Sequence, residues 1–404
     1  MTYDGHSAGD SSWRHPAPDA RYARGYGWQA GWKDSLERSL LPAAFRSRAY
    51  KPARYLNRRK AVIVTYHGFT DTRSHHGIEN HERKHVHVDD FRTQVAFLKQ
   101  HYQVLPLADL VRILATGEPL PERSAVITID DGYRSTYTLA YPVLREQGVP
   151  AVVFFATEYV DAKRYLWTDR VEYAIDRAPA GTYRLHSGGI DLQLPLAPRS
   201  LGEGGLNGLE SRAAADRLVR SAIKALPQAT RDEAVDALER TTGARLGTGD
   251  AVPAIYQPVE WTEAVEMARS GVMAIGSHTH THVILSRCRP EAAADELQRS
   301  RQIIENRLSM SCDLFCYPNG RRGDFNETTK QLVQEAGYTC ALTTVHGLNA
   351  PGADVFTLKR YPMTGRMVQG ELEVRLSGVV EWPSTIRDAA GSAFAFGRGS
   401  RRHG

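Results

Sequence analysis

Two adjacent carboxylates, Asp130 and Asp131, follow the apolar run 125–129 in the stretch AVITIDDGY. An unalternating run of this kind predicts a strand buried on both faces, as in a parallel sheet. Gly132 then predicts a turn directly after the strand. Folds of the α/β class place their chemistry at the carboxyl ends of such strands. Consecutive strand residues point to opposite sides, so the two carboxylates can have different roles. A bare Asp-Asp pair also fits a helix cap beside a solvated side chain, and other residues must decide.

Three histidines follow a second predicted strand, in the stretch SHTHTH at 277–282. Histidines four residues apart face the same side of a helical turn, so His278 and His282 can share one metal ion, while His280 points elsewhere. Thr279 stands where a zincin motif has glutamate. With a carboxylate from another strand, the pair makes a site of two histidines and one carboxylate. Non-haem iron oxygenases use the same triad, usually on an antiparallel jelly roll.

A third predicted strand, 314–317, ends in Tyr317, Pro318, Asn319 and Gly320. A turn of this composition can direct backbone N–H groups into a site, where they would stabilise an oxyanion. An ordinary turn is the alternative, and the motif means little by itself.

The elements around these motifs alternate between strand and helix. A strand at 61–66 ends in His67, and helices and strands then follow each other as far as 157. This rhythm predicts a β/α architecture with right-handed crossovers. Residues 160–256 interrupt it with helical segments around a stretch, 180–207, that contains scattered glycines. We expect an insertion there that covers one edge of the site, and the β/α rhythm returns at Trp261.

The composition restricts the class of protein. A chain of 404 residues allows one large domain plus additions, and its net charge of +5 is too mild to argue for a nucleic-acid partner. The longest apolar run is far too short for a membrane span, and residues 1–30 lack the apolar core of a secretory signal, so we expect a cytoplasmic protein. The four cysteines do not form pairs of CxxC motifs, which argues against a zinc knuckle.

The two ends of the chain read differently from its middle. Residues 1–57 predict a poorly structured, basic arm, and residues 381–404 a flexible tail rich in Gly, Ser and Arg. The arm carries Trp28 and Trp32 and could rest on an anionic membrane surface. A loose arm that packs on the folded domain is the alternative.

Taken together, TIDDG at 128–132, the segment 261–282 and FCYPNG at 315–320 resemble the polysaccharide deacetylases of carbohydrate esterase family 4, the NodB-homology domain. The similarity runs from about Val62 to Met363. It implies a distorted (β/α) barrel over 58–380 that carries a mostly helical insertion at 160–256. The residues that this resemblance implies for the site are Asp131, His278 and His282 as ligands of a divalent metal ion, Zn²⁺ being the first choice, Asp130 as catalytic base, a backbone N–H near Tyr317 for the oxyanion, and Pro318, Asn319, Gly320 and Trp167 for the substrate.

The chain departs from the family pattern in its third motif. Cys316 stands where many members have an arginine that orients the base, so another group, acting through water or directly, must do so. The usual fourth and fifth motifs are not evident. The chain is similar to a subgroup with a Tyr-His element after the first strand and a YPxG third motif, seen in exopolysaccharide N-deacetylases. That similarity implies an active-site role for His67, as general acid or as a contact to the substrate. Asp169 and Asp324 are weaker candidates, and His346 is a second possible general acid.

The function expected on these grounds is hydrolysis of N-acetyl groups on amino sugars of a polysaccharide or oligosaccharide, in which metal-bound water attacks the acetyl carbonyl. Chitooligosaccharide deacetylases are the analogy for a cytoplasmic enzyme. O-deacetylation of an acetylated glycan by the same site stays open. A catalytically silent carbohydrate-binding barrel is the third alternative, and the intact Asp-Asp and His pairs argue against it.

Overall fold

The computed structural model describes residues 43–199, 205–224, 226–247, 252–365, 367 and 369–379. The chain forms two compact units, Leu56–Met367 and a smaller one built from the residues before and after it. In the smaller unit, helix α2 (Tyr50–Leu56) and helix α13 (Gln369–Leu376) bury Tyr50 against Val374, and the ring of Phe45 stacks on Tyr50 at 5.8 Å. The described part of the predicted arm is therefore helical, not poorly structured. Trp28, Trp32 and the predicted tail 381–404 lie outside the described residues.

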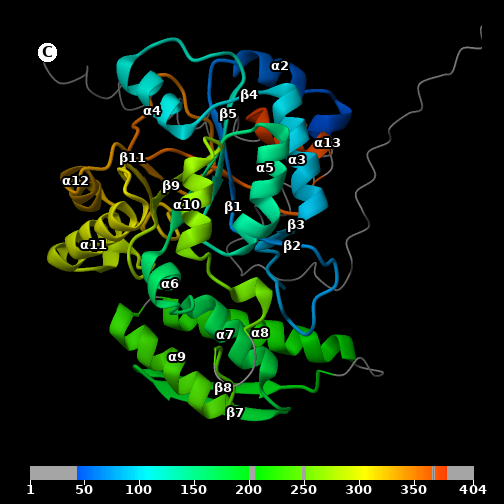
Figure 1. Cartoon of the computed structure of the whole chain (residues 1–404). Coiled ribbons are helices and arrows are strands. Elements are labelled where there is room, and N and C mark those ends of the chain that lie inside the picture. The colour runs from blue at the N-terminus through cyan, green and yellow to red at the C-terminus, as the bar shows by residue number, and fades with distance from the viewer. Residues whose placement is uncertain are drawn as a thin grey trace, which may run out of the picture. The chain divides into compact units, whose positions relative to one another are not determined.

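The larger unit is built on an eight-stranded sheet in which all pairs are parallel (Figure 1). The strand order is β11-β10-β9-β6-β5-β1-β12, with β4 also paired to β5. The strands are β1 (Val62–Tyr66), β4 (Gln103–Val104), β5 (Ser124–Ile129), β6 (Ala151–Phe155), β9 (Met273–Ser277), β10 (Leu314–Cys316), β11 (Cys340–Leu342) and β12 (Tyr361–Pro362). The curled sheet forms a half-barrel, which confirms the prediction of a distorted (β/α) barrel.

Helices cover the outside of this sheet, as the β/α rhythm predicts. They are α3 (Val88–His101), α4 (Leu107–Thr116), α5 (Tyr141–Gln147) with the π-helical turn Thr136–Ala140 before it, α6 (Thr157–Ala162), α10 (Trp261–Arg269), α11 (Pro290–Leu308) and α12 (Glu327–Glu335). The apolar face of α4 shows how they attach. Leu110 and Leu114 lie in one buried cluster with Ile63, Val126 and Phe154 from the strands. The helix ends at Gly117, whose φ of 72° is left-handed and favours glycine.

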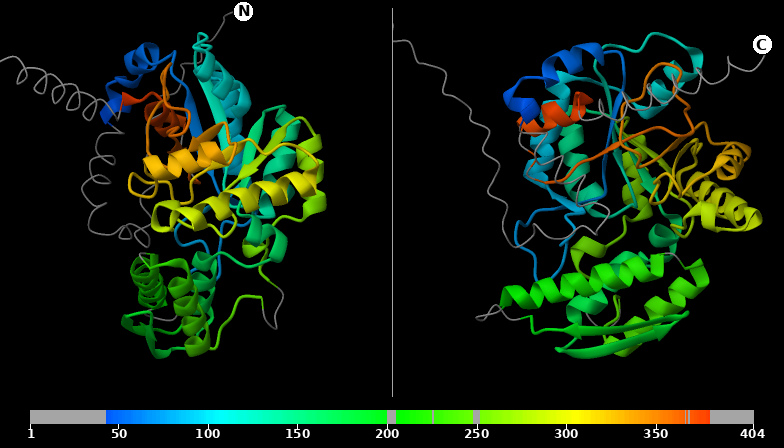
Figure 2. Two further views of the ribbon diagram at one scale, coloured as in Figure 1. Left: turned by 90° about the vertical axis from the view of Figure 1, so that its left-hand side faces the viewer. Right: turned by 180° about the vertical axis from the view of Figure 1, so that it is seen from behind.

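The segment predicted as an insertion has a hydrophobic core of its own. It contains α7 (Trp167–Arg177), the antiparallel hairpin β7 (Gly181–Ser187) and β8 (Ile190–Leu196), α8 (Gly205–Lys224) and α9 (Gln228–Thr242). The hairpin turns at Gly188 and Gly189, both with positive φ, which the sequence did not lead us to expect. The helices pack on the hairpin (Figure 2), and the buried cluster of the insertion shares no residue with the cluster behind α4.

The register of the sheet brings the three motifs to one edge. Tyr66 of β1 pairs with Ile129 of β5, so His67 and Asp130 follow at the same level. Phe155 of β6 pairs with Ser277 of β9, and the carbonyl of Phe155 accepts from the His278 N–H at 2.8 Å. Because all these strands are parallel, the residues that follow them meet at their common carboxyl ends.

Candidate active site

Asp131, His278 and His282 converge at the carboxyl edge of the sheet. Asp131 Oδ1 lies 3.7 Å from His278 Nε2 and 3.4 Å from His282 Nε2. Asp131 and Gly132 have φ values of 77° and 95°, so the chain turns sharply after β5 and carries the carboxylate to the histidines. One ligand atom from each of the three residues lies within 4.8 Å of the other two. The structure thus brings together the three residues that the resemblance implied as metal ligands.

The hydrogen bonds around the three residues suit a divalent cation. His278 Nδ1 lies 2.7 Å from the carbonyl oxygen of Cys316 and donates to it, which leaves the Nε2 lone pair facing Asp131. Burial lowers the pKa of His278 to about 4, so the ring is neutral near pH 7. Asp131 Oδ1 is buried and accepts no hydrogen bond. A buried acceptor that faces two imidazole nitrogens is the arrangement that Zn²⁺ and similar ions satisfy, and these residues fit such an ion.

A lysine that belongs to none of the predicted motifs contacts the same carboxylate. Lys84, from the loop before β3 (His85–His87), places Nζ 3.0 Å from Asp131 Oδ2 and 3.5 Å from Asp169 Oδ1. It also hydrogen-bonds the hydroxyl of Tyr133, which donates to Asp169 Oδ2 at 2.6 Å. Burial opposes ionisation of Asp131, but Lys84 and His282 outweigh it and hold the pKa of Asp131 well below its usual range. Asp131 thus offers Oδ1 to the histidines and Oδ2 to an ammonium group.

The neighbouring carboxylate, Asp130, is held by an arginine. Arg360 Nη1 and Nη2 each lie 2.8 Å from one Asp130 oxygen, and the arginine is completely buried. Burial alone would raise the pKa of Asp130, but Arg360 outweighs it and lowers that pKa, so the carboxylate is ionised at neutral pH. We expected some unidentified group to orient Asp130. The structure identifies it as Arg360, which immediately precedes β12, far from the position where the family motif has its arginine.

Cys316, at that motif position, takes part in the same arrangement. Arg360 Nη2 lies 3.0 Å from Cys316 Sγ, and the thiol lies 3.8 Å from Asp130 Oδ2. Burial raises the pKa of this thiol well above its usual range, so it is a protonated sulfhydryl. Asp130, His278 and Cys316 also cluster closely enough to be considered as metal ligands. This second set is the less suitable metal site. A cysteine ligand must be deprotonated, whereas the Cys316 thiol is protonated, and Arg360 already binds the Asp130 carboxylate.

The turn after β10 contains the backbone N–H groups that we expected to support an oxyanion. The backbone N–H of Tyr317 donates to the carbonyl of Leu342 at 3.0 Å, so it continues the pairing with β11 and cannot also bind an oxyanion. The Tyr317 ring is buried and stacks on Phe325 at 5.1 Å. In the same turn, Asn319 has a φ of 61°, and its N–H has no partner in the described part of the chain. Of the backbone N–H groups near Tyr317, that of Tyr317 is thus engaged in the sheet and that of Asn319 stays available as a donor. An oxyanion donor in this turn stays a prediction.

The remaining predicted residues divide into two groups. His67 is half-buried at the end of β1; burial lowers the pKa of its imidazole, while Asp131 and Asp130 oppose that shift. Trp167 lines a pocket together with His282. Asp324 caps its own turn by accepting from the Arg321 N–H at 3.1 Å, and His346 is exposed, with its ring 6.3 Å from Tyr361. No described contact brings Asp324 to the aspartate pair.

Known proteins provide an independent comparison. The family model described as polysaccharide deacetylase matches residues 117–194 and 229–341. Poly-beta-1,6-N-acetyl-D-glucosamine N-deacetylase of Escherichia coli K12 is 38% identical over 77 residues, which are 19% of this chain and 12% of that protein. YxkH of Bacillus subtilis is 19% identical over 287 residues, 71% of this chain and 68% of that protein.

The solved structure of the Streptococcus pyogenes deacetylase PplD in complex with acetate aligns with a TM-score of 0.51 and 17% identity, over 78% of this chain and 98% of that one. At this identity the likeness speaks for the fold alone. The chain aligns with only 12% of the length of the E. coli relative. The comparison therefore supports a shared family and says nothing of the activity of the whole relative. Residues 117–194 and 229–341 of this chain thus belong to the polysaccharide deacetylase family.

Proposed function

We propose that this chain is a metal-dependent hydrolase that removes N-acetyl groups from amino sugars of a polysaccharide or oligosaccharide. The observation that carries the proposal is the pair of neighbouring carboxylates with separate partners. Asp131 faces two histidines, whereas Asp130 is held by Arg360 at 2.8 Å on each oxygen. One carboxylate is thus arranged for a cation and the other stays free of it.

The ligands of the cation are Asp131, His278 and His282, and Zn²⁺ is the ion we propose because two imidazoles and one carboxylate are a ligand set typical of it. When bound, such an ion polarises the acetyl carbonyl and lowers the pKa of a coordinated water. The neutral state of His278 and the ionised state of Asp131 suit this role, since a metal ligand must offer an unprotonated lone pair.

Asp130 serves as the general base. It takes the proton of the water that attacks the acetyl carbonyl, and Arg360 keeps it ionised and fixed in orientation until it does so. The Asn319 N–H supports the negative charge that develops on the carbonyl oxygen. His67, at the end of β1 beside both aspartates, is the group placed to hydrogen-bond the substrate or the leaving nitrogen.

An amino-sugar substrate is supported by the names of the relatives. The E. coli protein and a Staphylococcus epidermidis protein, 30% identical over 77 residues that cover 26% of its length, are both named poly-beta-1,6-N-acetyl-D-glucosamine N-deacetylases. The same site could hydrolyse an acetyl ester, because attack on an ester carbonyl needs the same base and oxyanion donor. We regard O-deacetylation as the second candidate.

A cytoplasmic location is part of the proposal. Contact of the N-terminal arm, residues 1–57, with an anionic membrane surface is a further hypothesis, and residues 1–42 of that arm lie outside the described residues. In the described part of the chain, no helix combines the length and hydropathy that a bilayer span requires.

Acetate release from a panel of glycans tests the function. We expect release from N-acetylglucosamine oligosaccharides that requires a divalent metal and is abolished by a chelator. Release from acetyl-xylan but from no N-acetylated glycan would favour the esterase. A chain that binds glycans but releases no acetate, with metal bound, would overturn both.

A further inference from the structure

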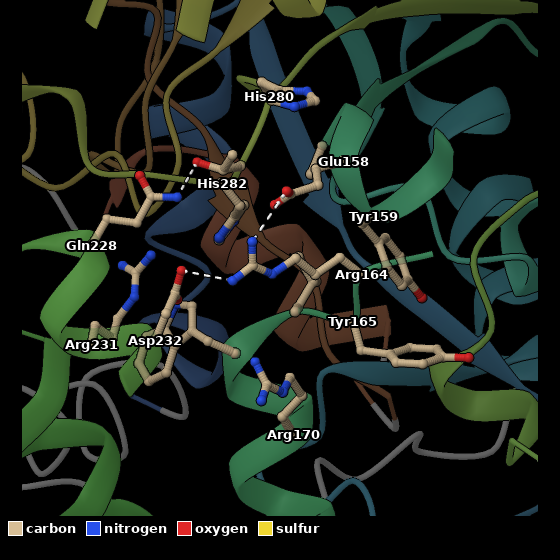
Figure 3. Close-up of a pocket in the computed structure, with 14 residues that line it drawn as sticks. Glu158, Tyr159, Arg164, Tyr165, Arg170, Gln228, Arg231, Asp232, His280 and His282 are labelled. Carbon is tan, nitrogen blue, oxygen red and sulfur yellow. Dashed lines mark hydrogen bonds and ion pairs between the residues drawn. The ribbon is translucent and has the colours of Figure 1, made fainter. Parts of the chain in front are cut away.

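A pocket adjoins the candidate metal site on the side of the insertion (Figure 3). It is open to solvent, and its free space together with the solvent at its mouth is about 380 Å³. Its wall comes from segments that are distant in sequence: α6 with Glu158, the start of α7 with Trp167, the start of α9 with Arg231, and the segment after β9 with His282. Gln228 Nε2 donates to Thr281 Oγ1 at 2.7 Å, which fixes the first turn of α9 against the histidine segment. The pocket is therefore a fixed feature next to a proposed metal ligand.

The charges that line this pocket do not balance. Arg164 pairs with Glu158 at 3.3 Å and with Asp232 at 3.0 Å, so both acidic groups of the wall already have a cation. Arg170 pairs with Asp236 and Glu239, outside the pocket wall, at 2.5 and 2.7 Å. Arg231 is left over, because none of its guanidinium nitrogens makes a hydrogen bond or ion pair with a described residue.

Arg231 is nevertheless 96% buried, since only 4% of its surface is exposed. A guanidinium group in this position loses its hydration, and an unpaired buried charge is costly. The ring of Trp167, 5.3 Å from the Arg231 carbon Cζ, compensates only part of that loss. In Figure 3 the guanidinium lies between Gln228 and Asp232, at the wall of the pocket. A buried cation that makes no ion pair with a described residue indicates that a ligand supplies the anion.

A second observation points to the same kind of ligand. Trp167 Nε1 and Arg231 Nε are both buried without a hydrogen-bond partner. Both groups are donors only, so what they lack is an acceptor. The positive end of the 15-residue helix α9 also lies here, because Arg231 stands near its first turn. A ligand rich in acceptor oxygens and negatively charged would satisfy all three features.

We propose that this pocket binds an oxyanion carried by the glycan, a carboxylate or a phosphate on a sugar next to the acetylated one, with Arg231 as its charge partner and Trp167 at its side. The inference rests on the proposed deacetylase function and adds that the substrate is an acidic glycan. Arg231 and Trp167 are specificity-determining residues and take no part in the chemical step. The fork of an arginine matches the two oxygens of a carboxylate, so a uronic acid is the first choice.

Matched oligosaccharides separate this inference from the function itself. Four N-acetylated oligosaccharides of equal length carry a uronic acid, its carboxyl-reduced form, a phosphate or no charge next to the acetylated sugar. For the full chain with its metal, we expect kcat/KM at least tenfold higher for a charged oligosaccharide than for the neutral ones, since a hydrogen bond to a charged group contributes about 1.5–3 kcal/mol. Comparison of kcat/KM for the uronic acid and the phosphate oligosaccharides then shows which of the two anions the pocket prefers.

Three variants locate the effect. Arg231→Gln should reduce the preference for the charged oligosaccharide to within about threefold through a higher KM, with kcat/KM on the neutral one unchanged. Arg231→Lys should keep part of the preference. Arg240→Gln, an exposed arginine on the same helix, is the control for lost charge and should behave as wild type. Thermal melting of each variant checks that it is folded.

Calorimetric titration with the deacetylated acidic oligosaccharide measures binding in the absence of catalysis. Equal kcat/KM on all four oligosaccharides, or an Arg231→Gln variant that keeps its preference, overturns the inference and leaves the deacetylase function standing. Tight, Arg231-dependent binding of the acidic oligosaccharide with no acetate release from any substrate overturns the function and retains the acidic site. Binding that Arg231→Gln does not weaken also overturns the acidic site.

Discussion

The guanidinium of Arg360 lies 2.8 Å from each oxygen of Asp130. Arg360 directly precedes the edge strand β12, and Asp130 directly follows β5, two strands away in the sheet. Arg360 Nη1 also lies 3.0 Å from Thr65 Oγ1 and from Thr128 Oγ1. The ion pair is thus held by residues of β1 and β5 and by the residue before β12. It holds a buried charge in the ionised form that a general base needs.

Removing Arg360 should therefore change stability and pH dependence together. In Arg360→Met, Asp130 becomes an unpaired buried carboxylate, which we expect to cost about 3–5 kcal/mol in the free energy of unfolding. Its pKa should rise, because the group that lowered it is gone. The acid limb of the kcat/KM profile should then move to higher pH. Urea unfolding and a pH–rate profile measure the two effects.

The double variant Asp130→Asn with Arg360→Met is the control for this prediction. It contains no unpaired carboxylate, so it should recover part of the lost stability and none of the activity. A single variant that is as stable as wild type and has an unmoved acid limb would show that the ion pair does not set the state of Asp130.

Asp130→Asn alone should separate catalysis from metal binding. The amide keeps the shape of the side chain and cannot accept a proton, so kcat should fall about 10²–10⁴-fold. Metal content and melting temperature should stay near wild type, because the ligands are elsewhere. His278→Ala is the counterpart, and its metal content, measured by atomic emission, should fall towards zero. If Asp130→Asn loses the metal instead, the two aspartates have exchanged their roles.

Lys84 should weaken metal binding, because its ammonium neutralises one oxygen of Asp131 and repels a second cation. Lys84→Met should bind Zn²⁺ about tenfold more tightly in competition with a chromogenic chelator at fixed pH. Lys163→Met, which removes an exposed lysine paired with Glu260 at 2.8 Å, is the matched control and should not change the affinity. Weaker binding in Lys84→Met would mean instead that the lysine holds Asp131 in the orientation that the metal requires.

The residues that sequence reasoning found and missed differ in a physical respect. Asp131, His278 and His282 follow buried strands directly, and apolar runs before them fix where the strands end, so their convergence could be predicted. Arg360 and Lys84 lie in stretches without such a pattern. Arg360 is brought to the site by the pairing of β12 with β1, and Lys84 by the loop before β3. Nothing local indicates such pairings. The Tyr317 amide also pairs across the sheet, with the carbonyl of Leu342 in β11, and such a long-range pairing has no signal in the local sequence.

The last prediction concerns a buried carboxylate in the insertion. Glu172 of α7 accepts from the Tyr256 hydroxyl at 2.7 Å and from Arg220 Nη2 at 3.2 Å, with Asp216 and His81 close by. Burial raises the pKa of Glu172 to about 7, from an ordinary value of 4.5, although Arg220 opposes this. Between these two pH values the folded protein holds a proton that the unfolded chain has released.

Raising the pH through that window therefore removes stability, and above about pH 7 the loss is complete. Between pH 5 and pH 7.5 the free energy of unfolding should fall by about 3 kcal/mol from this group. Glu172→Gln is neutral at every pH and should lack that part of the slope, while Glu233→Gln, at an exposed position on α9, should keep it. Urea titrations at the two pH values compare the slopes. Parallel slopes for wild type and Glu172→Gln would show that Glu172 is ionised in the folded protein throughout, held so by Arg220.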